Sequence, residues 1–312
     1  MSRIPDEQVA RILSRWIGTT VPKLLGEGME GAVYELDQSF VVKLWFGGSA
    51  EALRRVAVFY DALDAKSFTF SAPRIAQVHT VEDRLITIER RLAGTTLSAA
   101  AAAGTVRPDD AYAMVVDLVA ELAGCGTLPV GRDLAVLGEQ VPLFAAGEEF
   151  PAALARLAGR RVERFWPVLS RAVAGLEAKA AALTGRLREV DTGRRAAIHG
   201  DLYPGNMLID GAGKLSAVLD WGFLTTEGDP AFDAAITAAI FDMYGPDAPR
   251  IEQDLLERME ERLGYDHDTM LVYRAAYSLI TANAYDPAGT DGHFAWCAAA
   301  LNRADVTRAL LG

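Results

Sequence analysis

Hydrophobic and polar positions alternate over three short stretches in the first part of the chain. These stretches, residues 24–36, 39–46 and 83–92, are rich in β-branched and aromatic residues and are bounded by Gly, Asp or Ser. Such runs are typical of β-strands. Between the second and the third, the apolar residues of 51–65 recur at helical spacing, which predicts an α-helix. The first part of the chain is therefore predicted to be a small β-rich unit that begins with one short helix.

Beyond Gly94, the apolar positions follow a helical period over most of the chain. Pro167 lies near the start of one predicted helix and marks either its beginning or a kink. A mixed segment at 196–220 interrupts the helices. The pattern predicts an α+β protein with a β-rich lobe at 1–92 and a larger, mostly helical lobe at 93–312. The helical stretches are 107–126, 151–159, 164–190 and from about 231 to the C-terminus.

The composition of the 312-residue chain is that of a globular protein with an acidic surface. Its hydrophobic fraction of 51% allows a sizeable core, and its formal net charge of −11 argues against nucleic acid as a partner. The charge suits a cationic substrate, although it is equally consistent with a solvated surface. The N-terminal residues are charged where a signal peptide would be apolar, and no apolar run reaches the length of a membrane span. We therefore expect a cytoplasmic protein with no membrane partner.

A glycine-rich stretch precedes a lysine on the next predicted strand. Gly26, Gly28 and Gly31 form a G-x-G-x-x-G run, for which a dinucleotide-binding loop is the first alternative. That loop opens a helix, whereas a strand pattern follows here, which favours a β-hairpin that covers phosphates. Lys43 stands among apolar residues, where its charge needs a partner, and nucleotide phosphates supply one. We expect Glu51 to be its second partner, the alternative being an acid placed there by the helix dipole.

The strongest signal is the sequence IHGDLYPGNMLID at 198–210, followed by AVLDWG at 217–222. Phosphoryl transfer needs a residue that accepts or orients the proton of the attacking hydroxyl, and ligands for the Mg²⁺ that bridges the phosphates. Asp201 suits the first role, and Asn206 and Asp220 offer the oxygen ligands that Mg²⁺ prefers. A tight turn between the two segments would bring the two ligands together. Each residue alone is more often structural, so the prediction rests on their joint order and spacing.

These motifs resemble the protein-kinase-like fold, and most closely its aminoglycoside phosphotransferase/choline kinase family of small-molecule kinases. His199 to Asn206 matches the family's H-G-D-x-x-x-x-N pattern, and Asp220-Trp221-Gly222 stands where protein kinases have D-F-G. The resemblance implies a two-lobed fold with a small β-rich N-lobe and a large helical C-lobe. It also implies transfer of the γ-phosphate of ATP or GTP, with Mg²⁺, to a hydroxyl of a small molecule.

The resemblance further implies roles for residues outside the two motifs. In the G-D-P-x-x-D pattern, Asp229 would cap a helix and Asp233 would brace the catalytic loop from behind. Two valines of the small lobe would cover the adenine and two leucines would form its floor, although each is equally well explained as ordinary core. The implied nucleotide-binding set is Gly26, Gly28, Gly31, Val33, Val41, Lys43, Glu51, Glu89, Leu208 and Leu219.

The acceptor is expected to be a small molecule, because the segment after Asp220 is too short for the peptide-docking segment of a protein kinase. The family resemblance and the acidic charge favour a cationic, hydroxylated acceptor, such as an aminoglycoside-like or basic peptide antibiotic. Acids in turn-rich loops also serve the local backbone, which is the alternative for some of the candidates. The candidate acceptor-binding residues are Glu227, Asp242, Asp286 and Asp291.

Other functions are compatible with the same sequence. The acceptor could be a neutral or choline-like metabolite such as a sugar, a nucleoside or an amino alcohol. A nucleotide-binding pseudokinase is disfavoured because Lys43, Asp201 and Asp220 are all present. A helical interaction protein would need exposed apolar faces on its long helices. The sequence is compatible with ATP or GTP as the donor, and with a monomer or a homodimer.

Overall fold

The computed structural model describes residues 6–17, 22–28, 30–137, 139 and 141–312. The chain forms two compact units. The first is Met1–Gly94 with Ser216–Leu219, and the second is Thr95–Leu215 with Asp220–Gly312. A short piece of chain from the middle of the sequence therefore joins the N-terminal unit, and segment 198–210, which carries the strongest sequence motif, lies wholly in the second unit.

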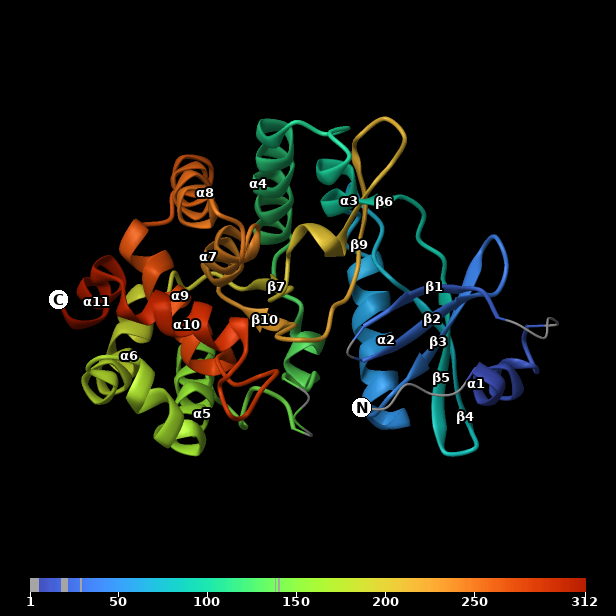
Figure 1. The fold of residues 1–312 in the computed structure, drawn as a ribbon, viewed down its shortest axis with the longest axis horizontal. Helices are drawn as coiled ribbons and strands as arrows, with labels where there is room; N and C mark the ends of the chain where they lie inside the picture. The colour runs from blue at the N-terminus through green and yellow to red at the C-terminus, as the bar shows by residue number, and fades with distance from the viewer. Residues whose placement is uncertain (1–5, 18–21, 29, 138, 140) are drawn as a thin grey trace. The chain divides into compact units, whose positions relative to one another are not determined.

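The first unit is built on a five-stranded antiparallel sheet (Figure 1). Its elements are α1 (Asp6–Leu13), β1 (Leu24–Glu27), β2 (Gly31–Glu35), β3 (Phe40–Trp45), α2 (Ala50–Asp64), β4 (Ile75–Val81) and β5 (Arg84–Arg90). The strand order is β1-β2-β3-β5-β4. The helix α1 packs on one face of this sheet, where its apolar residues join those of β3 and β5 in one core.

The strands predicted at 24–36, 39–46 and 83–92 and the helix predicted at 51–65 are confirmed. The first strand pattern is a hairpin, since β1 pairs antiparallel with β2. The strand β4 was not predicted. It lies at the edge of the sheet and most of its residues are at least partly exposed, so its sequence lacks the apolar pattern of a buried strand.

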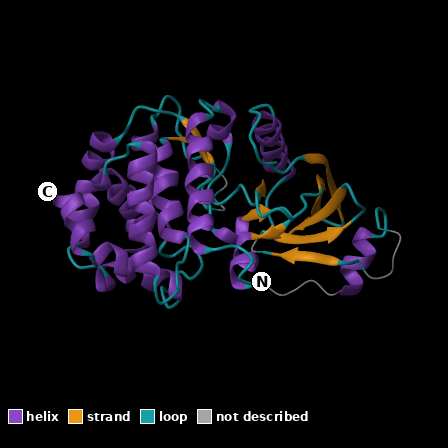
Figure 2. Cartoon of the chain, turned by 90° about the horizontal axis from the view of Figure 1, so that it is seen from above, coloured by secondary structure: helices purple, strands orange, loops and turns teal. Residues whose placement is uncertain are grey.

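The second unit is mostly helical (Figure 2). Its helices are α3 (Leu97–Ala102), α4 (Pro108–Gly124), α5 (Phe150–Ala172), α6 (Leu176–Val190), α7 (Pro230–Ile240), α8 (Ala248–Leu263), α9 (His267–Thr281), α10 (Gly292–Asn302) and α11 (Ala304–Leu311). The helix α9 is buried from Thr269 to Thr281 and packs against α5, α6, α7, α8, α10 and α11. A helix that is buried all round and surrounded in this way forms the centre of the core.

The chain from residue 95 to residue 228 also contains short strands and 3₁₀ turns. They are β6 (Thr95–Thr96), η1 (Pro129–Asp133), β7 (Ala196–Ile198), η2 (Pro204–Asn206), β8 (Met207–Ile209), β9 (Leu215–Val218) and β10 (Thr226–Gly228). Of these, β9 lies mostly in the first unit. β7 pairs antiparallel with β10, and β6 with β8. No helix in the described part of the chain is both long and apolar enough to cross a membrane.

The prediction of one continuous helix at 164–190 is wrong, because the structure has two helices there. The structure runs α5 from Phe150 through Pro167 to Ala172, and α6 begins separately at Leu176. Pro167 kinks α5, as one of the two alternatives had it, and Phe165 leaves the helical conformation with φ −110° and ψ 16°. The helix α5 ends before Val173, and Gly175, whose φ of +65° favours glycine, precedes α6 as its N-cap residue.

Candidate active site

A buried carboxylate holds the segment that carries the strongest sequence motif. Asp233, on α7, accepts the backbone N–H of His199 at 2.7 Å and that of Gly200 at 2.8 Å. Both residues follow β7, which is fixed in turn by its pairing with β10. The bracing role predicted for Asp233 is therefore confirmed. Two N–H bonds to one buried carboxylate define the path of the backbone immediately before Asp201.

Gly200 is required by this geometry. Its φ is +76°, and a Cβ atom there would lie 2.5 Å from the Cβ of Leu224. Any other residue would therefore be strained and would also clash with a buried leucine. The carbonyl of His199 accepts the hydroxyl of Thr225 at 2.9 Å, so the turn is held on both sides. The absence of a side chain at this position thus has a steric cause.

Asp201 and Asn206 contact each other directly. The Nδ2 of Asn206 donates to the backbone oxygen of Asp201 at 2.9 Å and to its Oδ2 at 3.3 Å. Asn206 is 2% exposed, and its own N–H donates to the carbonyl of Tyr203 at 2.9 Å. Because Nδ2 makes both bonds to Asp201, the amide oxygen Oδ1 is the atom that this side chain can offer to a cation. A hard oxygen ligand of this kind fits Mg²⁺.

Asp220 lies at the other end of the motif and is exposed. Its φ of +54° is in the left-handed region, which aspartate enters more readily than most residues. Burial raises the pKa of the Tyr203 phenol, and the charges of Asp201 and Asp220 raise it further. Both carboxylates therefore lie close enough to Tyr203 to act on it. The next residue, Trp221, is buried with its ring 4.5 Å from that of His199.

The turn between the two motif segments is stabilised within itself. Asp210 donates its N–H to the carbonyl of Lys214 at 2.8 Å, and its Oδ1 accepts the N–H groups of Ala212 and Lys214. This is the tight turn that the sequence predicted after β8. It reverses the chain direction and so returns it towards Asp220. In the described residues, no group of three or more His, Cys, Asp or Glu side chains is arranged to hold a metal.

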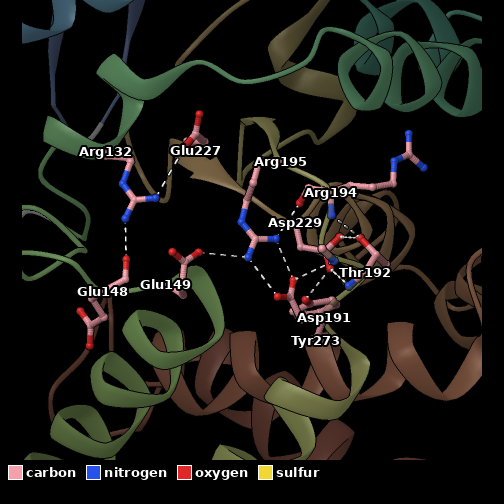
Figure 3. Close-up of polar contacts among 11 residues, drawn as sticks. Arg132, Glu148, Glu149, Asp191, Thr192, Arg194, Arg195, Glu227, Asp229 and Tyr273 are labelled. Atoms are coloured by element: carbon pink, nitrogen blue, oxygen red, sulfur yellow. Dashed lines mark hydrogen bonds and ion pairs between the residues drawn. The ribbon is translucent and has the colours of Figure 1, made fainter.

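Asp229 holds the start of α7 to the chain that leads into β7 (Figure 3). It caps the helix by accepting the N–H of Ala231, so its predicted capping role is confirmed. It also accepts the N–H and hydroxyl of Thr192, and the hydroxyl of Tyr273 at 2.9 Å. Burial raises the pKa of its carboxyl, and these hydrogen bonds oppose that shift. The helix that carries Asp233 is thereby fixed at its first turn.

In the first unit, four of the predicted nucleotide-binding residues share one face of the sheet. Val33 is the cross-strand partner of Lys43, and Val41 that of Glu89. Cross-strand partners point to the same face, and residues two apart on a strand do so as well. The residues of β3 and β5 that pack against α1 alternate with these, so the four lie on the face opposite to α1.

The predicted ion pair between Lys43 and Glu51 is not formed. The Nζ of Lys43 lies 3.5 Å from Glu30 and 3.8 Å from the centre of the Trp45 ring. Glu51 is exposed and pairs with Arg55, one helical turn further along α2, at 2.6 Å. The physical reason is local, because acid and base four residues apart on a helix meet without any tertiary constraint. The alternative of a helix-terminal acid is the one that describes Glu51.

The three glycines of the hairpin differ in what the structure demands. A Cβ on Gly31 would lie 2.4 Å from the carbonyl oxygen of Leu44, so only glycine allows β2 to approach β3 this closely. Gly26 and Gly28 have open space around the position of a Cβ. The N–H of Gly28 donates to the carbonyl of Gly31 and closes the turn. Gly31 therefore has a structural function in the sheet, and the other two leave room above the hairpin.

The two predicted leucines occupy different units. Leu208 is a buried residue of β8 in the second unit. Leu219 is half-buried and ends the piece of chain that belongs to the first unit. In that piece, Val218 donates its N–H to the carbonyl of Ser71, and Ser71 donates its own to Ser216. Leu208 thus lies in β8 and Leu219 directly follows β9.

Glu227 does not belong to an acceptor groove, contrary to the prediction. It is 4% exposed, and its Oε2 accepts the N–H of Leu128 at 2.7 Å. Its Oε1 lies 3.6 Å from Arg132, whose guanidinium also reaches the backbone of Glu148 (Figure 3). The carboxylate is therefore used to attach η1 to β10. A buried acid with partners of its own has no capacity left for a solvent-borne cation.

Two of the other three predicted acids serve nearby backbone. Asp242 accepts the N–H of Gly245, and Asp286 accepts two N–H groups and a hydroxyl within its own turn. The hydrogen bonds from Thr290 and the N–H of Ala288 lower the pKa of Asp286. Local backbone hydrogen bonds thus describe both. Asp291 likewise accepts a backbone N–H, that of Phe294 at the start of α10, but it also lines a cavity.

Asp291 lines a cavity that the sequence analysis missed. The cavity is wide open to solvent and has a volume of about 320 Å³, and both of its tyrosines are exposed. Its lining residues are Tyr244, Tyr285, Asp291, Gly292 and His293. The available signal was the pair of turns YGPD and YDPAGTDG, each of which begins with a tyrosine. The candidate acceptor-binding residues were predicted from their negative charge, so the tyrosines of these turns were not among them.

The buried Asp233 makes a testable prediction about pH. Burial raises the pKa of its carboxyl from 3.8 to about 7, while the N–H bonds from His199 and Gly200 oppose the shift. The folded state thus keeps a proton that the unfolded state loses near pH 4. Stability from this group is full below that pH and is lost as pH rises to about 7. Asp233→Asn stays neutral at every pH. We therefore expect the difference in the free energy of unfolding between the variant and wild type to shift in favour of the variant as pH rises from about 4 to about 7, by up to about 1.4 kcal/mol per pH unit. Urea unfolding of both proteins at pH 5 and pH 7 measures this difference. If the difference in the free energy of unfolding were the same at both pH values, the raised pKa of Asp233 would be contradicted.

Comparisons with known proteins agree with this arrangement. Residues 22–267 match the model of the phosphotransferase enzyme family. No curated protein sequence matches the chain. The structure is similar to that of aminoglycoside phosphotransferase APH(3'')-Id from Streptomyces rimosus ATCC10970, with 16% identity, coverage of 89% of this chain and 99% of that one, and a TM-score of 0.58.

Two further solved structures show the same fold. The GDP complex of wild-type aminoglycoside 2'-phosphotransferase-IIIa has 13% identity, covers 98% of this chain and 99% of its own, and gives a TM-score of 0.59. The macrolide 2'-phosphotransferase MphH from Brachybacterium faecium has 18% identity, with coverages of 95% and 98% and a TM-score of 0.54. The fold is therefore the protein-kinase-like α+β fold, with a small antiparallel sheet lobe and a helical lobe.

Proposed function

Because the chain belongs to the phosphotransferase enzyme family, we propose that it transfers the γ-phosphate of ATP or GTP to a hydroxyl of a small cationic molecule. The observation that carries the proposal is the braced loop. Asp233 holds the backbone before Asp201, and Asn206 holds Asp201 itself. A reactive carboxylate fixed in this way is what positioning of an attacking hydroxyl requires.

Asp201 would act on the acceptor. It is half-buried, and one carboxylate oxygen accepts the amide of Asn206 at 3.3 Å. The other oxygen can accept the hydroxyl proton of the acceptor. As the bond between the acceptor oxygen and the γ-phosphorus forms, the bond from that phosphorus to the β-phosphate oxygen breaks, and the hydroxyl proton passes to Asp201. The remaining nucleoside diphosphate is the leaving group.

Asn206 and Asp220 would hold Mg²⁺. One amide oxygen and one carboxylate are a sufficient protein share for this ion, which usually keeps waters and phosphate oxygens as its other ligands. When bound, the ion neutralises charge on the phosphates. Lys43 and the open hairpin around Gly28 would bind the nucleotide phosphates, and Val33, Val41 and the backbone near Glu89 its base. The nucleotide complexes of similar structures, with GDP and with ADP, support a nucleotide as the donor.

The acceptor would be a small molecule. β10 begins at Thr226, only a few residues after Asp220, and Glu227 is already buried within it, so little chain is free to dock a peptide. A net charge of −11 would attract a cation. Similar structures have been solved with streptomycin and with kanamycin, both of them complexes of aminoglycoside phosphotransferases.

A coupled assay tests the proposal. The protein is incubated with Mg-ATP or Mg-GTP and with amino-sugar antibiotics, basic peptide antibiotics, a macrolide, choline and simple sugars. We expect nucleoside diphosphate release that needs both Mg²⁺ and an acceptor, and that is faster with cationic acceptors than with neutral ones. Release that no acceptor stimulates would contradict the kinase assignment. Stimulation by neutral acceptors alone would contradict only the cationic substrate.

A further inference from the structure

The cavity at the start of α10 is built mainly from aromatic side chains. Tyr285 lies with its ring 4.8 Å from that of His293, edge to face, and stacks on Phe223 with ring centres 5.9 Å apart. Tyr244 adds a second tyrosine to the wall. The faces of such rings carry negative electrostatic potential and attract organic cations. The walls therefore favour a cationic group with an apolar surface over a neutral polar one.

His293 adds no competing positive charge. It is 4% exposed, and burial lowers its pKa to about 4, so the ring is neutral at pH 7. The hydroxyl of Thr281 donates to the carbonyl of Tyr277 and so accepts from the Nε2–H of His293 at 3.1 Å. The other nitrogen, Nδ1, is then an acceptor, and it is buried without a hydrogen-bond partner in the described part of the chain.

One carboxylate faces the cavity. Asp291 caps α10 by accepting the N–H of Phe294 at 2.7 Å, which fixes its orientation while it lines the wall. Tyr244 and Asp291 line the same cavity, and the pKa of the partly buried Tyr244 phenol is raised by its burial and also by the charge of Asp291. The other predicted acids are engaged elsewhere, in β10 or in their own turns. The charge of the cavity therefore matches a single cationic centre.

The cavity lies beside the segment that follows the proposed metal ligand Asp220, because its wall residue Tyr285 stacks on Phe223. Burial raises the pKa of Tyr285, and the negative charge of Asp201 raises it further, which places the two within electrostatic reach. Phe223, which stacks on Tyr285, is only three residues beyond Asp220. A ligand held at Tyr285 thus lies next to the segment that carries the proposed base and metal ligand.

Arg274 is the basic residue whose charge acts on His293. Its guanidinium lies 3.5 Å from Glu252 and over the ring of Trp296.

We propose that this cavity binds one organic ammonium group of the acceptor, against the rings of Tyr244 and Tyr285 and the carboxylate of Asp291. The proposal rests on the proposed function and narrows its substrate class. The acceptor is a hydroxylated amine whose recognition depends on one cationic centre set in apolar surroundings. A polycationic sugar would need several carboxylates, and the cavity presents one.

Tetramethylammonium chloride is the probe, and tert-butanol is its neutral counterpart of similar size. Binding is measured by ligand-detected NMR titration of the wild type, Asp291→Asn, Tyr285→Leu and Asp286→Asn. Asparagine keeps the helix cap at 291, so that variant changes charge with little effect on folding. Asp286→Asn is the matched control, because it removes the same charge from the same loop but does not line the cavity.

We expect tetramethylammonium to bind the wild type at least about fivefold more tightly than tert-butanol. Asp291→Asn and Tyr285→Leu should each weaken it by about fivefold, and Asp286→Asn by less than twofold. Equal binding of the neutral probe, or equal weakening by Asp286→Asn, would overturn the proposal. Thermal stabilisation by Mg-ATP, measured on the same samples, reports on the proposed function separately. If it persists while the probe fails to bind, only the ammonium site is wrong.

Discussion

Asp201→Asn is expected to lower kcat at least about a hundredfold while leaving the affinity for Mg-nucleotide within about twofold. Asparagine has the shape of aspartate and can still accept the Nδ2 of Asn206, so the loop should keep its conformation. It cannot accept the proton of the acceptor hydroxyl. Because Asp201 is proposed to contact the acceptor and not the phosphates, the loss should appear in turnover and not in nucleotide binding.

Asp210→Asn is the matched control for this experiment. Asp210 is exposed, lies in the turn after β8, and uses its carboxylate oxygen only for the local N–H bonds that asparagine can also accept. Its kcat should remain within about twofold of wild type, as is usual for surface substitutions. Steady-state kinetics and calorimetry with Mg-ATP measure both quantities. A kcat for Asp201→Asn above about a hundredth of wild type would exclude Asp201 as a general base of ordinary strength.

Asp220→Ala is expected to weaken Mg-nucleotide binding at least about tenfold and to lower kcat as well. The proposed reason is loss of a carboxylate ligand of the metal, which acts in both the bound and the reacting state. The backbone offers a second reason that must be separated from the first. Asp220 has a φ of +54°, and alanine in the left-handed region costs roughly 1 kcal/mol.

Two further variants separate the ligand from the backbone. Asp220→Asn keeps a residue that tolerates the left-handed region but removes the charge, so it should also bind Mg-nucleotide weakly. Asp83→Ala places alanine at a φ of +61° in the turn between β4 and β5, and should cost stability alone. Calorimetry with Mg-ATP and thermal unfolding distinguish the outcomes. An unchanged Mg-ATP affinity in both Asp220 variants would show that the metal assignment is wrong.

The fold and the loop from His199 to Asn206 could be predicted because their determinants are close together in the sequence. All strands of the first unit except β4 follow from local apolar patterns, and the loop from His199 to Asn206 closes through bonds between residues at most five positions apart. The bracing by Asp233 spans 33 and 34 residues, and it was expected only because the family resemblance supplied it. The predicted pair of Lys43 and Glu51 failed because Glu51 pairs locally with Arg55 on α2, while Lys43 lies near Glu30 and Trp45.

The candidate acceptor-binding residues show most clearly what the sequence determines and what depends on the tertiary structure. The sequence by itself determined the α+β fold, the hairpin with its glycines, and the spacing of Asp201, Asn206 and Asp220. Only the tertiary structure decided which carboxylates are available, because availability depends on neighbours from other elements. Glu227 is taken up by Leu128, 99 residues away, while Asp291 meets two tyrosines at a cavity wall. An acid has the same charge in either place, and burial with a partner or exposure to a cavity is a property of packing alone.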